Sequence, residues 1–334
     1  MTFSIDTIFD YAGLNSIIIL FLVLGFFGRN REYYSLTLKT LCAIVVIFSI
    51  VNYYYKRPSK GLWTNIEEED IALITGGSNG LGSDIVKQLL TTKISKIIIV
   101  DIVEPKINSE RIHYVSCDLS DDKVVLETFQ YIVKQLNHKG QHISILINNA
   151  GIRHNKSLLT LEQDEILKLF NVNTLSPIHI LKSIISNHIK NYQSKKLYIV
   201  TISSILGVLA PKNLSIYSAT KASMYSIHES LVEELSEYSK IRMLLVTPGQ
   251  LNTDMFKDVK PPMPFLAPLV ESKQLATKIV HKINYGEIGV IASPLYANFL
   301  PAIRALPYSL QKLARYLSRM DTKVIDKSTC KDIY

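Results

Sequence analysis

The chain has 334 residues, of which 47% are hydrophobic, and its formal net charge is +8. This length is enough for one large domain with an extension, and a core of that size needs no disulfide support. Three widely spaced cysteines, eight histidines without HExxH or CxxH spacing and no RNA-binding aromatic motif argue against a metal site and a nucleic-acid partner, so we expect neither.

Two apolar stretches stand near the N-terminus. Residues 11–28 and residues 40–55 contain no charged side chain. Each is close to the lower limit of about 17 to 20 residues that a helix needs to cross the hydrocarbon layer. Basic residues follow both stretches, and residues 53–55 are tyrosines where interfacial aromatic side chains would lie. We therefore predict that residues 1–65 form a membrane anchor with one or two transmembrane or membrane-embedded helices.

Other interpretations of these stretches are weaker. A cleaved signal peptide would begin with a basic region, whereas this chain begins with Asp6 and Asp10 and without Lys or Arg. A mitochondrial presequence would be rich in Arg and poor in acidic residues, and this segment is neither. A third interpretation is that both stretches are core helices of a soluble domain. It is less favoured, because the alternating strand and helix pattern begins only after them. The number of crossings and their orientation stay open, because the flanking charges are too even.

From residue 66 onward, short apolar runs alternate with helix-like segments. The runs are nearly continuous in apolar residues, as strands covered on both faces are. We predict strands at residues 71–75, 97–100, 113–116, 143–147, 197–202 and 243–246. Strands that alternate with helices at this spacing indicate an α/β domain, residues 66–285, with a parallel sheet between two layers of helices.

A glycine-rich turn follows the first predicted strand. Residues 75–82 read Thr-Gly-Gly-Ser-Asn-Gly-Leu-Gly, at the junction between a strand and a helix. Glycines let the backbone approach a pyrophosphate, and the helix N-terminus presents free N–H groups to it. Asp101 ends the next apolar run, nineteen residues after Gly82, close to the spacing of a carboxylate that binds a ribose diol. Because a carboxylate repels a 2′-phosphate, we favour NAD over NADP; the alternative is that Asp101 only caps a turn.

Further motifs follow these glycines in order, and residues 71–256 together resemble the short-chain dehydrogenase/reductase family. The resemblance implies a doubly wound, Rossmann-like fold and nicotinamide chemistry. It implies four catalytic residues: Asn173, Ser204, Tyr217 and Lys221. It also implies contacts with the cofactor by Thr75, Gly76, Ser78, Asn79, Gly80, Leu81, Gly82, Asp101, Asp118, Leu119, Asn149, Ala150, Gly151, Tyr217, Lys221, Pro248, Gly249 and Thr253.

The spacing of the catalytic residues suits proton transfer. Tyr217 and Lys221 are four residues apart, which on a helix places both side chains on one face. A tyrosine has a pKa of about 10, and we expect the ammonium of Lys221 to lower it. Ser204, thirteen residues before Tyr217, would bind the substrate oxygen, and Ser203 would be structural. Asn173 would hold a water molecule in a proton relay behind Lys221.

The C-terminal third of the chain is rich in apolar residues. Residues 251–270 include four prolines and follow the Pro-Gly turn, where the family keeps its substrate loop, so they suit a lipophilic substrate. Packing against the sheet or another subunit is an equal alternative. Residues 286–334 form a predicted helical tail, and residues 296–320 combine an apolar face with basic neighbours. This tail would be an interfacial helix, a cover for the core or a homodimer contact.

These features resemble the membrane-associated branch of the family, which includes retinol and hydroxysteroid dehydrogenases. We expect an NAD(P)-dependent oxidoreductase that interconverts an alcohol and a carbonyl on a steroid, retinoid or other lipid. Two alternatives stay open: an NADPH-dependent lipid-biosynthetic ketoreductase, and a catalytically idle membrane scaffold. We expect the catalytic domain to be cytosolic, on the endoplasmic reticulum or a lipid droplet, with the mitochondrial outer membrane as the alternative.

Overall fold

The computed structural model describes residues 63–257, 259 and 267–322, together with residues 43, 47, 51 and 54–56. The two predicted membrane helices, residues 11–28 and 40–55, lie outside the described residues except for these few positions. In the part of the chain that is described, no helix is both long and apolar enough to cross a membrane. The membrane anchor therefore stays a prediction from the sequence.

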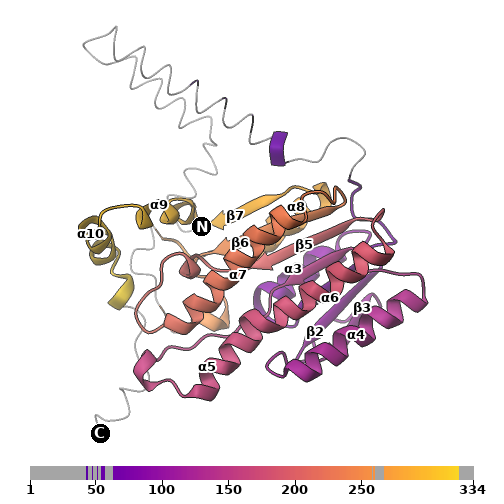
Figure 1. Cartoon of the computed structure of the whole chain (residues 1–334), viewed down its shortest axis with the longest axis horizontal. Coiled ribbons are helices and arrows are strands. Elements are labelled where there is room, and N and C mark those ends of the chain that lie inside the picture. The colour runs from indigo at the N-terminus through magenta and orange to yellow at the C-terminus, as the bar shows by residue number, and fades with distance from the viewer. Residues whose placement is uncertain are drawn as a thin grey trace.

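A parallel sheet forms the centre of the fold (Figure 1). In the described residues it has seven strands in the order β3-β2-β1-β4-β5-β6-β7, and all neighbouring strands are parallel. The strand order reverses between β1 and β4, and ligands of such sheets bind at the carboxyl ends beside this reversal. The strands are β1 (Ile71–Thr75), β2 (Lys96–Asp101), β3 (Ile112–Ser116), β4 (Ile145–Asn148), β5 (Leu197–Ile202), β6 (Ile241–Pro248) and β7 (Gly289–Ser293).

The structure confirms the six predicted strands and the Rossmann-like class, with one addition. The strand predicted at residues 143–147 lies at Ile145–Asn148 instead. The seventh strand, β7, was not predicted, because it begins with a glycine and only Ile291 of its five residues is buried. The domain boundary that the sequence predicts at residue 285 therefore falls before the last strand of the sheet.

Helices cover both faces of the sheet. Side chains alternate between the faces, so that Ala72 and Ile74 of β1 join one core while Ile71 and Leu73 join the other. On the first face lie α3 and α8, and on the second lie α4, α6 and α7 (Figure 1). The helices are α3 (Gly80–Leu90), α4 (Asp122–His138), α5 (Gln163–Phe170), α6 (Ser176–Asn191), α7 (Ser215–Glu234), α8 (Ser272–Tyr285), α9 (Leu300–Arg304) and α10 (Tyr308–Ser318).

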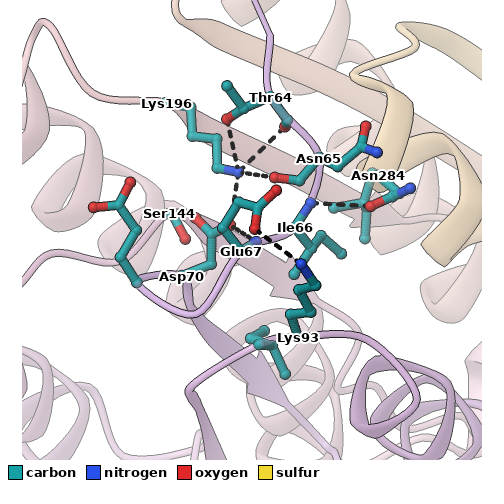
Figure 2. Close-up of polar contacts among 12 residues, drawn as sticks. Thr64, Asn65, Ile66, Glu67, Asp70, Lys93, Ser144, Lys196 and Asn284 are labelled. Atoms are coloured by element: carbon teal, nitrogen blue, oxygen red, sulfur yellow. Dashed lines mark hydrogen bonds and ion pairs between the residues drawn. The ribbon is translucent and has the colours of Figure 1, made fainter.

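A buried ion pair fastens the segment before β1 to the amino ends of the strands (Figure 2). Lys196 Nζ lies 2.6 Å from Asp70 Oδ2, and the Asp70 side chain is only 2% exposed. The same ammonium donates to the carbonyl oxygens of Asn65, at 2.6 Å, and Thr64, at 3.2 Å. Trp63 Nε1 donates to a carbonyl at the end of α8. Residues 63–65, predicted to belong to the anchor, thus pack against the α/β domain.

Replacing Asp70 by Ala should lower the free energy of unfolding by about 3 kcal/mol, because it leaves a largely buried ammonium without its counter-charge. The matched control is Glu69→Ala, which removes an exposed carboxylate 3.7 Å from Lys195 Nζ and should cost less than about 1 kcal/mol. Urea unfolding of the full-length protein in one detergent measures both effects. Equal losses in the two variants would contradict this assignment.

Candidate active site

The glycine turn after β1 requires glycine at several positions. Gly76 and Gly80 have φ angles of +66° and +54°, in the region that disfavours other residues. A Cβ atom on Gly76 would lie 2.8 Å from Ala150 Cα, and one on Gly82 would lie 2.0 Å from the Gly76 carbonyl oxygen. The turn therefore packs backbone against backbone, both on α3 and on the loop after β4.

Side chains from β1 and the loop after β4 hold this turn. Asn149 Nδ2 donates to the carbonyl oxygens of Thr75, at 3.1 Å, and Gly76, at 2.8 Å. Thr75 Oγ1 accepts hydrogen bonds from the backbone N–H groups of Asn149 and Ala150. The structure thus brings together four of the residues predicted to bind the cofactor, and their polar groups brace the turn.

The turn fits a dinucleotide. Helix α3 has no acidic residue in its first turn, and the Asn79 side chain makes no capping hydrogen bond, so the positive end of the helix dipole faces the turn. Asp101 Oδ2 accepts a hydrogen bond of 3.0 Å from Ser78 N, which places the carboxylate beside the glycines. Leu81 is buried in the core, so only its backbone is available to a cofactor. A pyrophosphate at the turn and a ribose at Asp101 suit this arrangement.

The predicted adenine-side residues lie at the carboxyl end of β3. Asp118 Oδ1 accepts hydrogen bonds of 2.8 Å from both the backbone N and the side-chain Oγ of Ser120, and these bonds lower the pKa of Asp118. The Leu119 carbonyl oxygen accepts a hydrogen bond of 2.7 Å from Ser176 Oγ at the start of α6. Both residues share the sheet edge that carries the glycine turn, two strands away.

The predicted catalytic side chains are all buried: Ser204 lies just after the carboxyl end of β5, Tyr217 and Lys221 lie in the first half of α7, and Asn173 lies between α5 and α6. The Ser204 side chain lies close enough to Tyr217 to oppose the rise in the pKa of that phenol, and its Oγ accepts a hydrogen bond of 3.1 Å from Leu206 N. Gly207 permits this meeting, because a Cβ atom there would lie 2.8 Å from Ala222 N in α7. Ser203 Oγ donates to the Lys221 carbonyl oxygen at 2.7 Å, which is a structural contact, as expected.

Lys221 and Asn173 both lie beside Gly151. A Cβ atom on Gly151 would lie 3.3 Å from Lys221 Nζ and 3.4 Å from Asn173 Oδ1, so a larger residue would crowd both. Lys221 Nζ donates to the Ile202 carbonyl oxygen at 3.0 Å. The Nδ2 protons of Asn173 go to the Ile152 carbonyl oxygen and to Thr220 Oγ1, at 2.8 and 3.0 Å. A relay water would therefore need an acceptor atom of Asn173 rather than its amide protons.

Asn173 belongs to a π-helical turn, Asn171–Leu175, between α5 and α6. Such turns interrupt the regular hydrogen-bond ladder and are frequent at functional sites. Asn173 Oδ1 accepts a hydrogen bond of 2.8 Å from Ile152 N, which joins the turn to the loop after β4. The turn therefore sets Asn173 at a fixed place beside that loop.

Burial controls the pKa values of the two central groups. It raises the pKa of Tyr217 to about 12, against the opposing effects of the Ser204 hydroxyl and the Arg153 charge. Burial also lowers the pKa of Lys221 to about 8. The expectation that Lys221 lowers the pKa of Tyr217 is therefore wrong for the protein alone, because the loss of solvation outweighs the favourable neighbours.

The three residues predicted to bind the cofactor at and after the end of β6 lie in two different places. Gly249 N donates to the Ser293 carbonyl oxygen at 2.6 Å, and a Cβ atom on Gly249 would lie 2.8 Å from Pro294 Cδ, so Pro248 and Gly249 pack on the end of β7. Thr253 lies over the glycine turn, with its Cγ2 3.4 Å from the position of a Cβ atom on Gly80. Of the three, Thr253 is the one that reaches the turn.

Two residues directly after the Asn-Asn-Ala-Gly motif were not predicted. The Arg153 guanidinium lies 4.7 Å from the centre of the Phe256 ring, and its Nε donates to the Met255 carbonyl oxygen. The Phe256 ring in turn meets the Tyr217 ring edge-on, with centroids 6.1 Å apart. His154 Nε2 accepts a hydrogen bond of 3.3 Å from Tyr217 N in the first turn of α7. The one feature of the sequence that could have indicated these two residues is their position close to the Asn-Asn-Ala-Gly motif.

Replacing Lys221 by Met should raise the free energy of unfolding at pH 7, without dinucleotide, by about 1 to 3 kcal/mol, because a buried charge is removed. The folded-state pKa of about 8 is below the ordinary lysine value of 10.5, so protonation of Lys221 opposes folding below pH 8. The gain should shrink as the pH rises from about 8 toward 10.5. Urea unfolding against pH measures it, with the exposed Lys273→Met as control. A gain that is absent or constant with pH would refute this.

The chain is similar in sequence to known proteins. A family model for short chain dehydrogenases matches residues 70–264. The uncharacterized oxidoreductase TDA5 of Saccharomyces cerevisiae is 37% identical over 298 residues, which cover 87% of this chain and 89% of that protein. More distant relatives are 3-oxoacyl-[acyl-carrier-protein] reductase FabG of Buchnera aphidicola, 29% identical over 66% of this chain and 84% of its own, and mouse epidermal retinol dehydrogenase 2, 28% identical over 71% and 78%.

The fold is also that of solved enzymes. A short chain dehydrogenase from Burkholderia cenocepacia, solved in complex with NADP, superposes with a TM-score of 0.61 at 21% sequence identity, over 75% of this chain and 99% of its own. The chain belongs to the short-chain dehydrogenase family, and it is an NAD(P)-dependent oxidoreductase that acts on alcohol and carbonyl groups.

Proposed function

We propose that this protein interconverts a secondary alcohol and a ketone on a lipophilic substrate, with NAD as its cofactor, and that Tyr217, Ser204, Lys221 and Asn173 carry the catalysis. The observation that supports this most directly is that Tyr217 and Ser204 are both buried at the end of β5, with the Ser204 side chain close enough to affect the pKa of the Tyr217 phenol. Both side chains lie on the sheet edge that also carries the glycine turn. An idle scaffold would have no need to keep four polar side chains buried there.

The proposed chemistry moves a hydride and a proton separately. A bound nicotinamide supplies or accepts the hydride at the substrate carbon. The Ser204 hydroxyl holds the substrate oxygen by a hydrogen bond, and Tyr217 Oη gives that oxygen its proton in reduction or takes it in oxidation. With a pKa of about 12, Tyr217 is a neutral phenol in the protein alone, so it is ready to donate. Lys221, 3.0 Å from the Ile202 carbonyl oxygen, stabilises the phenolate that remains.

The apolar surroundings of Tyr217 favour a lipophilic substrate. Tyr217 and Leu214 form a small apolar cluster with Leu206 and Phe256, separate from the two large cores. The mouse relative is named a retinol dehydrogenase, whereas the Buchnera relative is named a 3-oxoacyl-[acyl-carrier-protein] reductase. Because of the second name, an NADPH-dependent lipid-biosynthetic ketoreductase is the alternative function.

We further propose a membrane location, on the endoplasmic reticulum or a lipid droplet, with the catalytic domain in the cytosol. The support is the charge-free character of residues 11–28 and 40–55 together with the basic residues that follow them. The mitochondrial outer membrane is the alternative. Localisation of the tagged full-length protein distinguishes the three membranes.

Replacing Tyr217 by Phe should lower turnover by about 10²- to 10⁴-fold, the range of general acid–base catalysis, while dinucleotide binding persists. The assay uses full-length protein, NAD and NADP, and alcohols and ketones that differ only in chain length. Long-chain compounds should be turned over better than short ones. Tyr225→Phe, on the same helix and partly exposed, is the matched control and should keep its activity. Normal turnover in Tyr217→Phe would remove the phenol from the mechanism.

Asp101 is the basis for proposing NAD. Its carboxylate is fixed by Ser78 N at 3.0 Å, at the end of β2, where the ribose of a dinucleotide on the glycine turn would lie. A 2′-phosphate there would meet a negative charge at close range, which is unfavourable even with solvent screening.

Replacing Asp101 by Asn keeps the shape of the side chain but removes its charge. The ratio of the affinities for NAD and NADP should fall by about tenfold or more, equivalent to about 1.4 kcal/mol. Titration of each dinucleotide against the protein measures the ratio. Glu104→Gln, which removes an exposed carboxylate three residues later, should leave it unchanged. An unaltered ratio in Asp101→Asn would exclude Asp101 as the determinant.

A further inference from the structure

Helix α10 presents its apolar face to solvent. Leu310, Leu313 and Leu317 are 46%, 51% and 60% exposed, and their spacing of three and four residues places them on one side of the helix. No residue of α10 is buried. In a helix that covers a core, this apolar face would be the hidden one, so α10 does not serve as a cover for the described core.

The opposite side of α10 is attached to the domain. Arg315 lies about half a turn around the helix from the three leucines. Its guanidinium donates to Asp321 Oδ1 at 2.6 Å and to the Ala210 carbonyl oxygen at 2.9 Å, and Lys212 N donates to the same Asp321 carboxylate at 2.9 Å. Polar contacts therefore hold the helix in an orientation that turns its leucines outward.

The charged residues in the segment that contains α9 and α10 are all basic. Residues 299–320 contain four basic residues and no acidic one, and of these Arg304, Lys312 and Arg319 are exposed. Helix α10 also carries two exposed tyrosines, Tyr308 and Tyr316, a residue type that is frequent at lipid interfaces. An apolar helix face with basic neighbours matches the surface of an anionic bilayer.

The position of α10 in the fold agrees with such a partner. Helices α9 and α10 follow the end of the edge strand β7 (Figure 1). At the start of the same strand, Ile288 N donates to the Lys56 carbonyl oxygen at 3.0 Å, immediately after the exposed Tyr54 and Tyr55. The two ends of β7 therefore carry the end of the predicted membrane anchor and the apolar helix.

We propose that the exposed face of α10, formed by Leu310, Leu313 and Leu317, lies on the surface of an anionic phospholipid bilayer. A second copy of the chain is a weaker occupant. In a two-fold dimer this face would meet itself, so the basic residues around it would approach their own copies. Lipid headgroups of opposite charge carry no such cost.

This contact would place the bilayer beside the catalytic helix. Ala210 and Lys212, which α10 and the turn after it bind, belong to the loop that leads into α7, where Tyr217 lies in the first turn. A lipophilic substrate could then enter from the bilayer without crossing water. This last step rests on the proposed function, whereas the surface contact does not.

Hydrogen–deuterium exchange of the full-length protein tests the contact. The protein is reconstituted in phosphatidylcholine vesicles with or without phosphatidylserine, so the predicted anchor is present in both. Amides of residues 308–318 should exchange at least about tenfold more slowly in the anionic vesicles, and added salt should reduce the difference. No difference between the vesicles, or protection that depends on protein concentration at fixed lipid, would overturn the proposal.

A matched pair of triple variants separates this surface from general effects of apolar exposure. Leu310→Ser, Leu313→Ser and Leu317→Ser together should abolish the protection. The control replaces Leu126, Leu159 and Leu167 by Ser, three exposed leucines elsewhere, and should keep it. Turnover of a short soluble substrate should be equal in both, while KM for a long-chain substrate in vesicles should rise only in the α10 variant. Absence of turnover with every substrate would refute the proposed function and leave the exchange result standing.

Discussion

Helix α7 meets the carboxyl end of β5 through backbone atoms, and the whole candidate site depends on this contact. Gly207 has no side chain that could separate the loop after β5 from α7, and Ser203 Oγ bonds the Lys221 carbonyl oxygen at 2.7 Å. Ser204 is thereby held against Tyr217, and Lys221 Nζ reaches the carbonyl oxygen of Ile202 at 3.0 Å. Because β5 and α7 are regular elements packed in the core, they fix the geometry of the site before any ligand binds.

The same contact has an electrostatic cost. It buries a phenol and an ammonium together, and burial favours the neutral form of each. The pKa of Tyr217 is therefore raised to about 12, and the pKa of Lys221 is lowered to about 8. Neighbouring groups recover only part of the lost solvation: the Ser204 hydroxyl and the charge of Arg153 for Tyr217, and the carbonyl oxygen of Ile202 for Lys221. Such a site trades folding stability for reactivity, as functional sites commonly do.

The sequence predicts what is local or periodic, and little else. Strands covered on both faces are continuous apolar runs, so six of them could be located, whereas β7 is a half-exposed edge strand and could not. The glycine turn and the four candidate catalytic residues could be predicted because each lies in a short motif that resembles one of the family's. Arg153 and Met255 are more than 100 residues apart in sequence, and no pattern indicates that their loops meet. The sign of the Tyr217 shift was missed because a sequence gives the neighbour of a group but not the depth of its burial.

The amino and carboxyl ends of the strands have different roles. This separation explains how the fold accommodates the loss of stability that comes from burying Tyr217 and Lys221. At the amino ends, the buried pair of Asp70 and Lys196 ties the segment before β1 to the strands, far from any residue predicted to bind substrate or cofactor. At the carboxyl ends, the polar groups of Thr75, Asn149 and Asn173 are used to hold loops in place. A ligand therefore binds to loops that are already ordered, and less of its binding energy is lost in ordering them.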